Sequence, residues 1–73
     1  MAAKSLRVAY DEESDVLYLS FGKPRKAISR ELQPGVLTRL DLRSRMTMGL
    51  TIIDFRKRFA AKPEDAIPVP LVA

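Results

Sequence analysis

Short segments in which apolar and polar residues alternate, separated by polar turns, fill the first 55 residues of this chain. Leu6, Val8 and Tyr10 alternate with smaller or polar residues, and a period of two residues is typical of a half-buried β-strand. Residues 16–21 are apolar on both faces, which predicts a central strand. Short connections between consecutive strands favour antiparallel pairing. This pattern restricts the chain to a mainly β fold.

Further strands are expected over residues 27–32, 36–42 and 48–55. Pro34-Gly35, between the first two of these, is a type II turn signal. The acidic segment of residues 11–15 begins with a turn-forming Asp and is predicted to be a hairpin loop. The strands therefore follow one another as an antiparallel meander.

One short helix is expected after the strands. Asp54 is the predicted N-cap of a helix from Phe55 to Lys62, which Pro63 ends. Phe55 and Phe59 are four residues apart, so both side chains can pack on the sheet from one helix face. A helix this short depends on that packing, because isolated short helices are marginal in water.

The C-terminal residues are apolar but interrupted by prolines. The segment Ile67–Val72 cannot form a helix interior or a central strand, because Pro lacks the backbone N–H that both require, and we expect it to be extended. We predict one small domain over residues 1–73, with a core over about residues 5–62 and an extended tail over residues 63–73. The fold class is α+β and mainly β, with about five antiparallel strands in a meander and one short C-terminal helix.

The small size of the chain makes additional burial necessary. A domain of 73 residues buries only about 60% of the surface that its unfolded chain exposes. The chain has no cysteine for a disulfide, so we expect further burial to come from a second copy of the chain, in a dimer, or from one protein partner. The candidate contact residues lie in the last strand and the tail: Ile52, Ile53, Ile67, Val69 and Leu71.

The absence of two residue types excludes several functions. Without Cys and His, the chain has no thiolate nucleophile, no imidazole acid or base and no Cys/His metal site. The four carboxylates of residues 11–15 lack the spacing and the Gly of a calcium loop, so we expect no metal and no cofactor. A single small sheet has little room for a catalytic cleft, and we predict that the protein is not an enzyme.

The sequence contains no apolar run near the roughly 20 residues that a membrane helix needs. The N-terminus has no apolar run followed by a cleavage site. We therefore expect a cytoplasmic protein that does not bind a membrane.

The basic residues leave a second function open. The formal net charge is +4, and a phosphate-contacting face is one interpretation of the arginines; a solvated surface is the other. No recognition helix is visible, and the aromatic residues occupy core-like positions rather than interleaving with the arginines. Sequence-independent nucleic-acid binding is therefore kept as the alternative, and its candidate residues are Arg30, Arg39, Arg43, Arg45, Arg56 and Arg58.

Residues 10–19 carry a distinctive motif: Tyr-Asp, a short polar link, then Asp-x-Leu-Tyr-Leu. With this motif the sequence resembles the domain-of-unknown-function family 2283, a family of small prokaryotic proteins. A second family feature is similar in residues 34–37 and 49–55, and the resemblance extends from Leu6 to Phe59. Thr51 stands where the family often has Glu, so an acidic binding feature is not expected on that strand.

The resemblance implies a small sheet-dominated domain with a C-terminal helix and no established activity. Some relatives lie beside small toxin-like proteins and are regarded as antitoxins, which favours a protein-binding or self-assembling module. The residues themselves support a structural interpretation of the motif, in which the tyrosines flank a hairpin and the two aspartates cap the backbone N–H groups of its turn. The motif residues are Tyr10, Asp11, Asp15, Leu17 and Tyr18.

Overall fold

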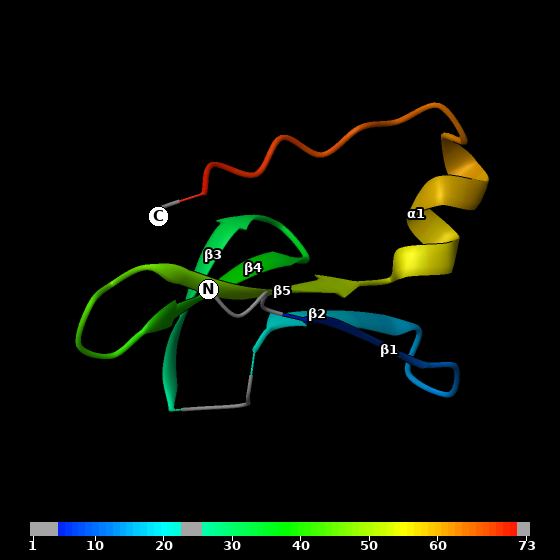
Figure 1. Cartoon of the computed structure of the whole chain (residues 1–73). Helices are drawn as coiled ribbons and strands as arrows, with labels where there is room; N and C mark the ends of the chain where they lie inside the picture. Colours follow the sequence, from blue (N-terminus) through cyan, green and yellow to red (C-terminus); the bar gives the residue numbers. More distant parts are fainter. Residues whose placement is uncertain (1–4, 23–25, 72–73) are drawn as a thin grey trace.

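Five strands and one helix make up the protein in the computed structural model, which describes residues 5–22 and 26–71. The antiparallel sheet and the short C-terminal helix predicted from the sequence are confirmed (Figure 1). Part of the predicted break after the second strand, Lys23-Pro24, and the last two residues of the tail lie outside the described residues. The elements are β1 (Leu6–Asp11), β2 (Val16–Phe21), β3 (Ala27–Gln33), β4 (Val36–Asp41), β5 (Thr47–Ile53) and α1 (Phe55–Ala61).

The strand order is β1-β2-β5-β4-β3, so the prediction of a simple meander is wrong at one connection. After β2 the chain crosses to the far edge, and hairpins then bring β5 back to pair with β2. This order places the apolar strands β2 and β5 next to each other in the centre. The more polar β1 and β3 form the two edges, where charged side chains remain in water.

The strand register defines the two faces of the sheet. Leu17 lies opposite Ile52, which lies opposite Val36, and this side of the sheet, the covered face, holds most of the core. Val36 is fully buried, and Thr38, Met48 and Ile52 are nearly so. The other side, the open face, carries Tyr18, 42% exposed, opposite Thr51.

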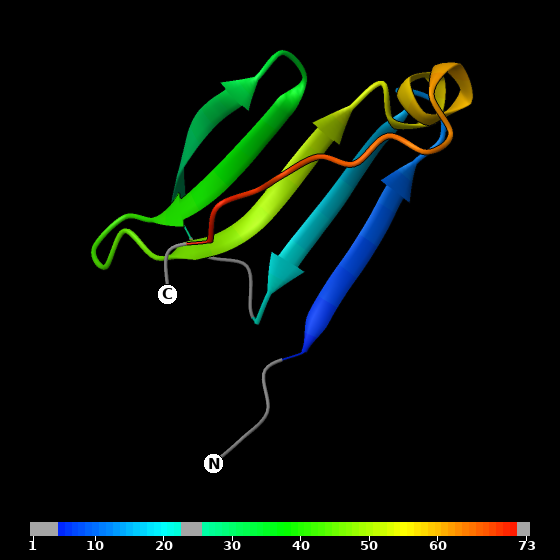
Figure 2. The ribbon, with the colours of Figure 1, turned by 90° about the horizontal axis from the view of Figure 1, so that it is seen from above.

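The tail passes over the covered face. Figures 1 and 2 show the segment after α1 turning back along the sheet and crossing above β5. Ile67 and Val69 are half-buried, whereas Pro68 and Pro70 between and after them are exposed. An extended segment turns alternate side chains to opposite sides, so the two branched residues face inward and the prolines face water.

The turn between β3 and β4 has the expected chemistry. Gly35 has a φ of 82°, which is the left-handed conformation that the third position of a type II turn requires. The Gly35 carbonyl accepts a hydrogen bond of 2.7 Å from the Ile53 N–H, which ties this turn to the end of β5. Within the described ranges, no helix has the length and apolar character needed to cross a membrane.

Candidate functional site

The turn between β1 and β2 is organised by the side chain of Asp11. Its Oδ1 accepts hydrogen bonds from the backbone N–H groups of Glu13, at 3.1 Å, and Ser14, at 3.3 Å. Hydrogen bonds from the Ser14 hydroxyl and backbone hold the pKa of Asp11 below its ordinary value. Asp11 therefore caps its own turn, as the structural interpretation of the motif expects.

Asp15 makes a different and longer-range set of contacts. Its carboxylate accepts hydrogen bonds from the backbone N–H groups of Arg56, at 2.8 Å, and Lys57, at 3.1 Å. Its carbonyl accepts a third from the N–H of Phe55, at 3.0 Å. The first N–H groups of a helix have no partner within the helix, so Asp15 satisfies the N-terminus of α1 from a distant part of the chain.

The prediction that Asp54 caps the helix is therefore wrong. Asp54 occupies the N-cap position, but its side chain makes no capping hydrogen bond. An N-cap residue that bonds the helix usually has an extended backbone, whereas Asp54 is left-handed with a φ of 56°. The expectation that Asp15 caps the β1–β2 turn is corrected in the same way, because its carboxylate bonds the helix instead.

Tyr10 fixes the Asp15 carboxylate from the other side. The Tyr10 hydroxyl donates a hydrogen bond of 2.6 Å to Asp15 Oδ1. The Tyr10 ring meets Phe55 edge-on at 5.9 Å between centroids, and the Arg56 guanidinium lies over the Tyr10 ring at 5.7 Å. The Phe55 ring in turn packs against the Phe59 ring, with 5.2 Å between the two centroids. We call this cluster of Tyr10, Asp15, Phe55, Arg56 and Phe59 the turn–helix junction.

The electrostatics of the junction favour inert protonation states. The hydrogen bond to Asp15 raises the pKa of Tyr10 above its ordinary value of 10.0. The same bond, with the N–H of Arg56, lowers the pKa of Asp15 below its ordinary value of 3.8. Tyr10 therefore stays protonated and Asp15 stays ionised at neutral pH, so neither group is poised to exchange a proton.

The remaining motif residues take no part in the hydrogen bonds of the junction, although Leu17 lies opposite Tyr10 in the strand register. Leu17 is half-buried on the covered face, opposite Ile52. Tyr18 is on the open face, opposite Ala9. The five motif residues thus divide between a turn, a helix cap, the core and the open face, and they do not converge on one binding site.

The six arginines proposed as a nucleic-acid face are also dispersed. Arg30 pairs with Thr38 and lies on the covered face, whereas Arg39 pairs with Gly49 and lies on the open face. Arg43 and Arg45 are in the turn before β5, and α1 follows the opposite end of that strand. The prediction of a single arginine face is therefore not supported by the geometry.

Two of these arginines already have partners at the helix. Arg56 stacks on Tyr10 as described, and Arg58 donates a hydrogen bond of 2.6 Å to the Pro34 carbonyl. Arg58 also lies 3.1 Å from the position that a Cβ on Gly35 would occupy, so a larger residue there would displace it. Both side chains serve to hold α1 against the sheet.

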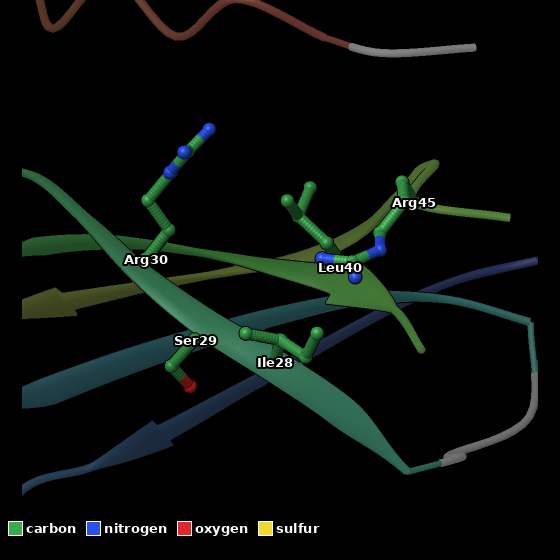
Figure 3. A pocket seen from close by; sticks show the side chains of 5 residues that line it. All are labelled: Ile28, Ser29, Arg30, Leu40 and Arg45. Carbon is green, nitrogen blue, oxygen red and sulfur yellow. The ribbon is translucent and has the colours of Figure 1, made fainter. Parts of the chain in front are cut away.

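Two of the other arginines, Arg30 and Arg45, line one hollow of the surface. It has a volume of about 420 Å³ at the β3 edge and is lined by Ile28, Ser29, Arg30, Leu40 and Arg45. Figure 3 shows Arg30 and Leu40 on the side of the sheet along which the tail passes, and Ser29 pointing to the opposite side. In the described part of the chain, no group of three or more acidic side chains could hold a metal ion.

The residues predicted to mediate oligomer contacts fall into two groups. Ile52 is only 6% exposed in the core, so it is not available to a partner. Ile67 and Val69 are half-buried against the protomer's own sheet. Ile53 and Leu71 remain exposed.

Sequence reasoning missed an exposed apolar strip on β1. Leu6 is 52% exposed and Val8 is 63% exposed, and both lie on the same face of β1 as Tyr10. Their alternation was visible in the sequence, but it was read as a half-buried strand. Only the strand order shows that β1 is an edge strand, on which Leu6 and Val8 remain exposed while Tyr10 contacts α1.

A protein-family model with the description "Protein of unknown function (DUF2283)" matches residues 7–56 of the chain. No curated protein and no solved structure gives a significant match. The matched range begins in β1 and ends at Arg56, so it includes all of the turn–helix junction except Phe59. The family resemblance seen in the sequence is thereby confirmed.

Proposed function

The chain belongs to the DUF2283 family, and we propose that it is a non-enzymatic protein-binding and self-assembling module whose binding element is the edge strand β1. The observation that carries this proposal is the exposure of β1. All six of its residues are exposed, and Leu6, Val8 and Tyr10 form an apolar strip on one face. An uncovered apolar edge strand is a template for pairing with another chain.

The backbone of β1 supports the proposal independently of its side chains. The Gly22 N–H donates to the Ser5 carbonyl at 2.9 Å, so odd-numbered residues of β1 point their backbone groups toward β2. The N–H and C=O groups of Leu6, Val8 and Tyr10 therefore point outward. No described strand pairs with them, and a bound strand would satisfy all of these groups.

The chemistry of the motif residues supports a non-enzymatic role. Tyr10 and Asp15 form the pair that comes closest to an acid–base site, and their hydrogen bonds hold the helix in place. Both pKa shifts move the groups away from neutral pH. A general acid or base works best with a pKa near the working pH, so this pair is better suited to structure than to catalysis.

The proposal is tested by blocking the outer edge of β1 without disturbing its inner edge. Val8→Pro removes an outward N–H, and edge strands tolerate Pro at such positions. Tagged wild-type and Val8→Pro chains would be used to capture proteins from native lysate, with and without nuclease. We expect a stoichiometric protein with the wild type and at least a tenfold loss with Val8→Pro. Val8→Thr is the matched control, because it keeps the N–H and the branched shape.

Each outcome separates the candidate functions. A captured protein that depends on the Val8 N–H supports the module, and a toxin-like protein among the captured species would identify the antitoxin role that the family resemblance suggests. Capture that is equal for wild type and a folded Val8→Pro chain would overturn β1 as the binding element. Recovery of nucleic acid that falls steeply with salt would favour the arginine alternative, because counterion release makes phosphate binding salt-dependent.

A further inference from the structure

We infer that β1 pairs with β1 of a second copy of this chain, antiparallel and centred on Ala9, to form one continuous sheet across a two-fold axis. This inference rests on the proposed function and names the partner and the register. The two-fold axis is perpendicular to the sheet. Such an interface is self-complementary, since each copy contributes the same strand.

The backbone restricts the possible registers. Outward N–H and C=O groups belong to even-numbered residues of β1. Antiparallel self-pairing must therefore place even-numbered residues opposite one another. Two registers use most of the strand: one is centred on Val8 and the other on Ala9.

The charged residues of β1 favour one of these two registers. Arg7 and Asp11 both lie on the open face, at opposite ends of the strand. In the register centred on Ala9, Arg7 lies directly opposite Asp11 of the second copy, and the two-fold axis repeats this pair. In the register centred on Val8, Arg7 lies opposite Ala9, with Arg7 and Asp11 of the second copy as its two diagonal neighbours, so it has no charged residue directly opposite. Opposite charges across a strand pair stabilise it and like charges destabilise it, so charge favours the Ala9 register.

The covered face is complementary in the same register. Val8 lies opposite Tyr10 of the second copy, and the two exposed apolar strips join into one across the axis. The two backbone N–H groups of its own turn both bond Asp11 Oδ1, and a carboxylate has further lone pairs that can accept from Arg7 of the second copy. Within the described residues, Arg7 has no other ionic partner.

The fold leaves room for this pairing. The contacts of Tyr10 place α1 at the Asp11 end of β1. Antiparallel pairing sets the two helices at opposite ends of the joined strands, so they do not collide across the axis. The sheet would then have no exposed edge at β1, and only β3 would remain as an edge in each copy.

The register is tested by disulfide trapping, which is clean because the chain has no cysteine of its own. In the Ala9 register, two Ala9 residues form a non-hydrogen-bonded pair with Cα atoms about 4.5 Å apart, within disulfide range. Two Val8 residues are then diagonal neighbours, roughly 7–8 Å apart and too far to bridge. We expect Ala9→Cys to cross-link under mild oxidation and Val8→Cys not to, with Glu64→Cys as the control for collisions.

The charge pair is tested by sedimentation of the full chain. We expect Arg7→Glu to weaken the dimer by about tenfold, because two symmetry-related pairs change from attraction to repulsion. Arg43→Glu makes the same charge change in an exposed turn and should leave the dimer unchanged. An equal effect of both variants would contradict the register, since it would reflect net charge alone.

The outcomes distinguish this inference from the proposed function. Cross-linking of Val8→Cys rather than Ala9→Cys would overturn the Ala9 register. A chain that stays monomeric at high concentration, with no Ala9→Cys cross-link, would overturn self-pairing. If a captured protein is still lost with Val8→Pro in that case, the proposed function stands and β1 binds a different chain.

Discussion

The protein builds two hairpin turns in the same way and uses them differently. In the β1–β2 turn, the Asp11 carboxylate accepts the N–H groups of residues 13 and 14. In the β4–β5 turn, Asp41 Oδ1 accepts those of residues 43 and 44, at 2.8 and 3.0 Å. The fifth residue of each turn is left-handed: Asp15 has a φ of 58° and Arg45 a φ of 64°.

The difference lies in that fifth residue. Asp15 bonds the N-terminus of α1, whereas the Arg45 side chain lines the open hollow beside β3. The left-handed backbone is common to both turns, so it does not account for the docking of a helix. A single carboxylate at this position converts a local turn into a long-range connection.

The largest expected effect is a loss of thermal stability when the fifth residue of the β1–β2 turn, but not that of the β4–β5 turn, is replaced by Ala. Asp15→Ala removes two helix-capping bonds and the partner of Tyr10, and we expect the melting temperature to fall by roughly 5 °C. Arg45→Ala is the matched control, because it places the same residue in the same left-handed conformation. We expect it to shift the melting temperature by no more than about 1 °C. Equal losses in thermal unfolding would mean that the backbone conformation, and not the cap, determines the effect.

An effect of intermediate size is expected on the free energy of unfolding at acid pH. Because the folded pKa of Asp15 is lowered, the stability that its carboxylate contributes is complete above its ordinary pKa of 3.8 and is lost as the pH falls through the lower folded pKa. We expect Asp15→Asn to flatten the decrease of unfolding free energy below pH 4, and Arg45→Asn to leave it unchanged. Denaturant titrations between about pH 2 and pH 6 would measure both. An unaltered slope in Asp15→Asn would exclude Asp15 as the titrating group.

The smallest expected effect is that of a Gly substitution at the left-handed residue, and it changes the free energy of unfolding in opposite directions in the two turns. Gly adopts a positive φ without steric cost, so Arg45→Gly should stabilise the protein by about 0.5 kcal/mol after the added freedom of the unfolded chain is included. Asp15→Gly relieves the same conformation but removes the cap, and it should destabilise. Urea unfolding of the two variants, compared at equal m-value, would measure the two signs. Stabilisation by both substitutions would show that the cap contributes little.

Local sequence patterns predicted the elements well. The expected strand at residues 16–21 is β2 to the residue, and the helix begins at Phe55 as predicted. These elements follow from alternation, turn residues and a terminating Pro, all of which act over a few residues. The similarity of the two turns was not visible as a repeat, because within these five-residue segments only an Asp and a Ser recur.

The predictions that failed all concern contacts between segments that are distant in the sequence. The apolar residues on both faces of β2 indicate a central strand but do not say whether β3 or β5 is its second neighbour. The helix cap was assigned to Asp54, the adjacent residue, although the side chain that bonds α1 is Asp15, which precedes Arg56 by 41 positions. The arginines were grouped by abundance, and only the register separates Arg30 from Arg39.

The bonds from Asp15 to α1 also bear on the order of folding. A helix of seven residues does not persist alone, because nucleation costs more than so few hydrogen bonds return. Its N-terminal partner exists only after the β1–β2 hairpin has formed and β5 has returned to pair with β2. The helix is therefore a late structure that requires the completed sheet, and its amide protons should be no better protected from exchange than those of the sheet.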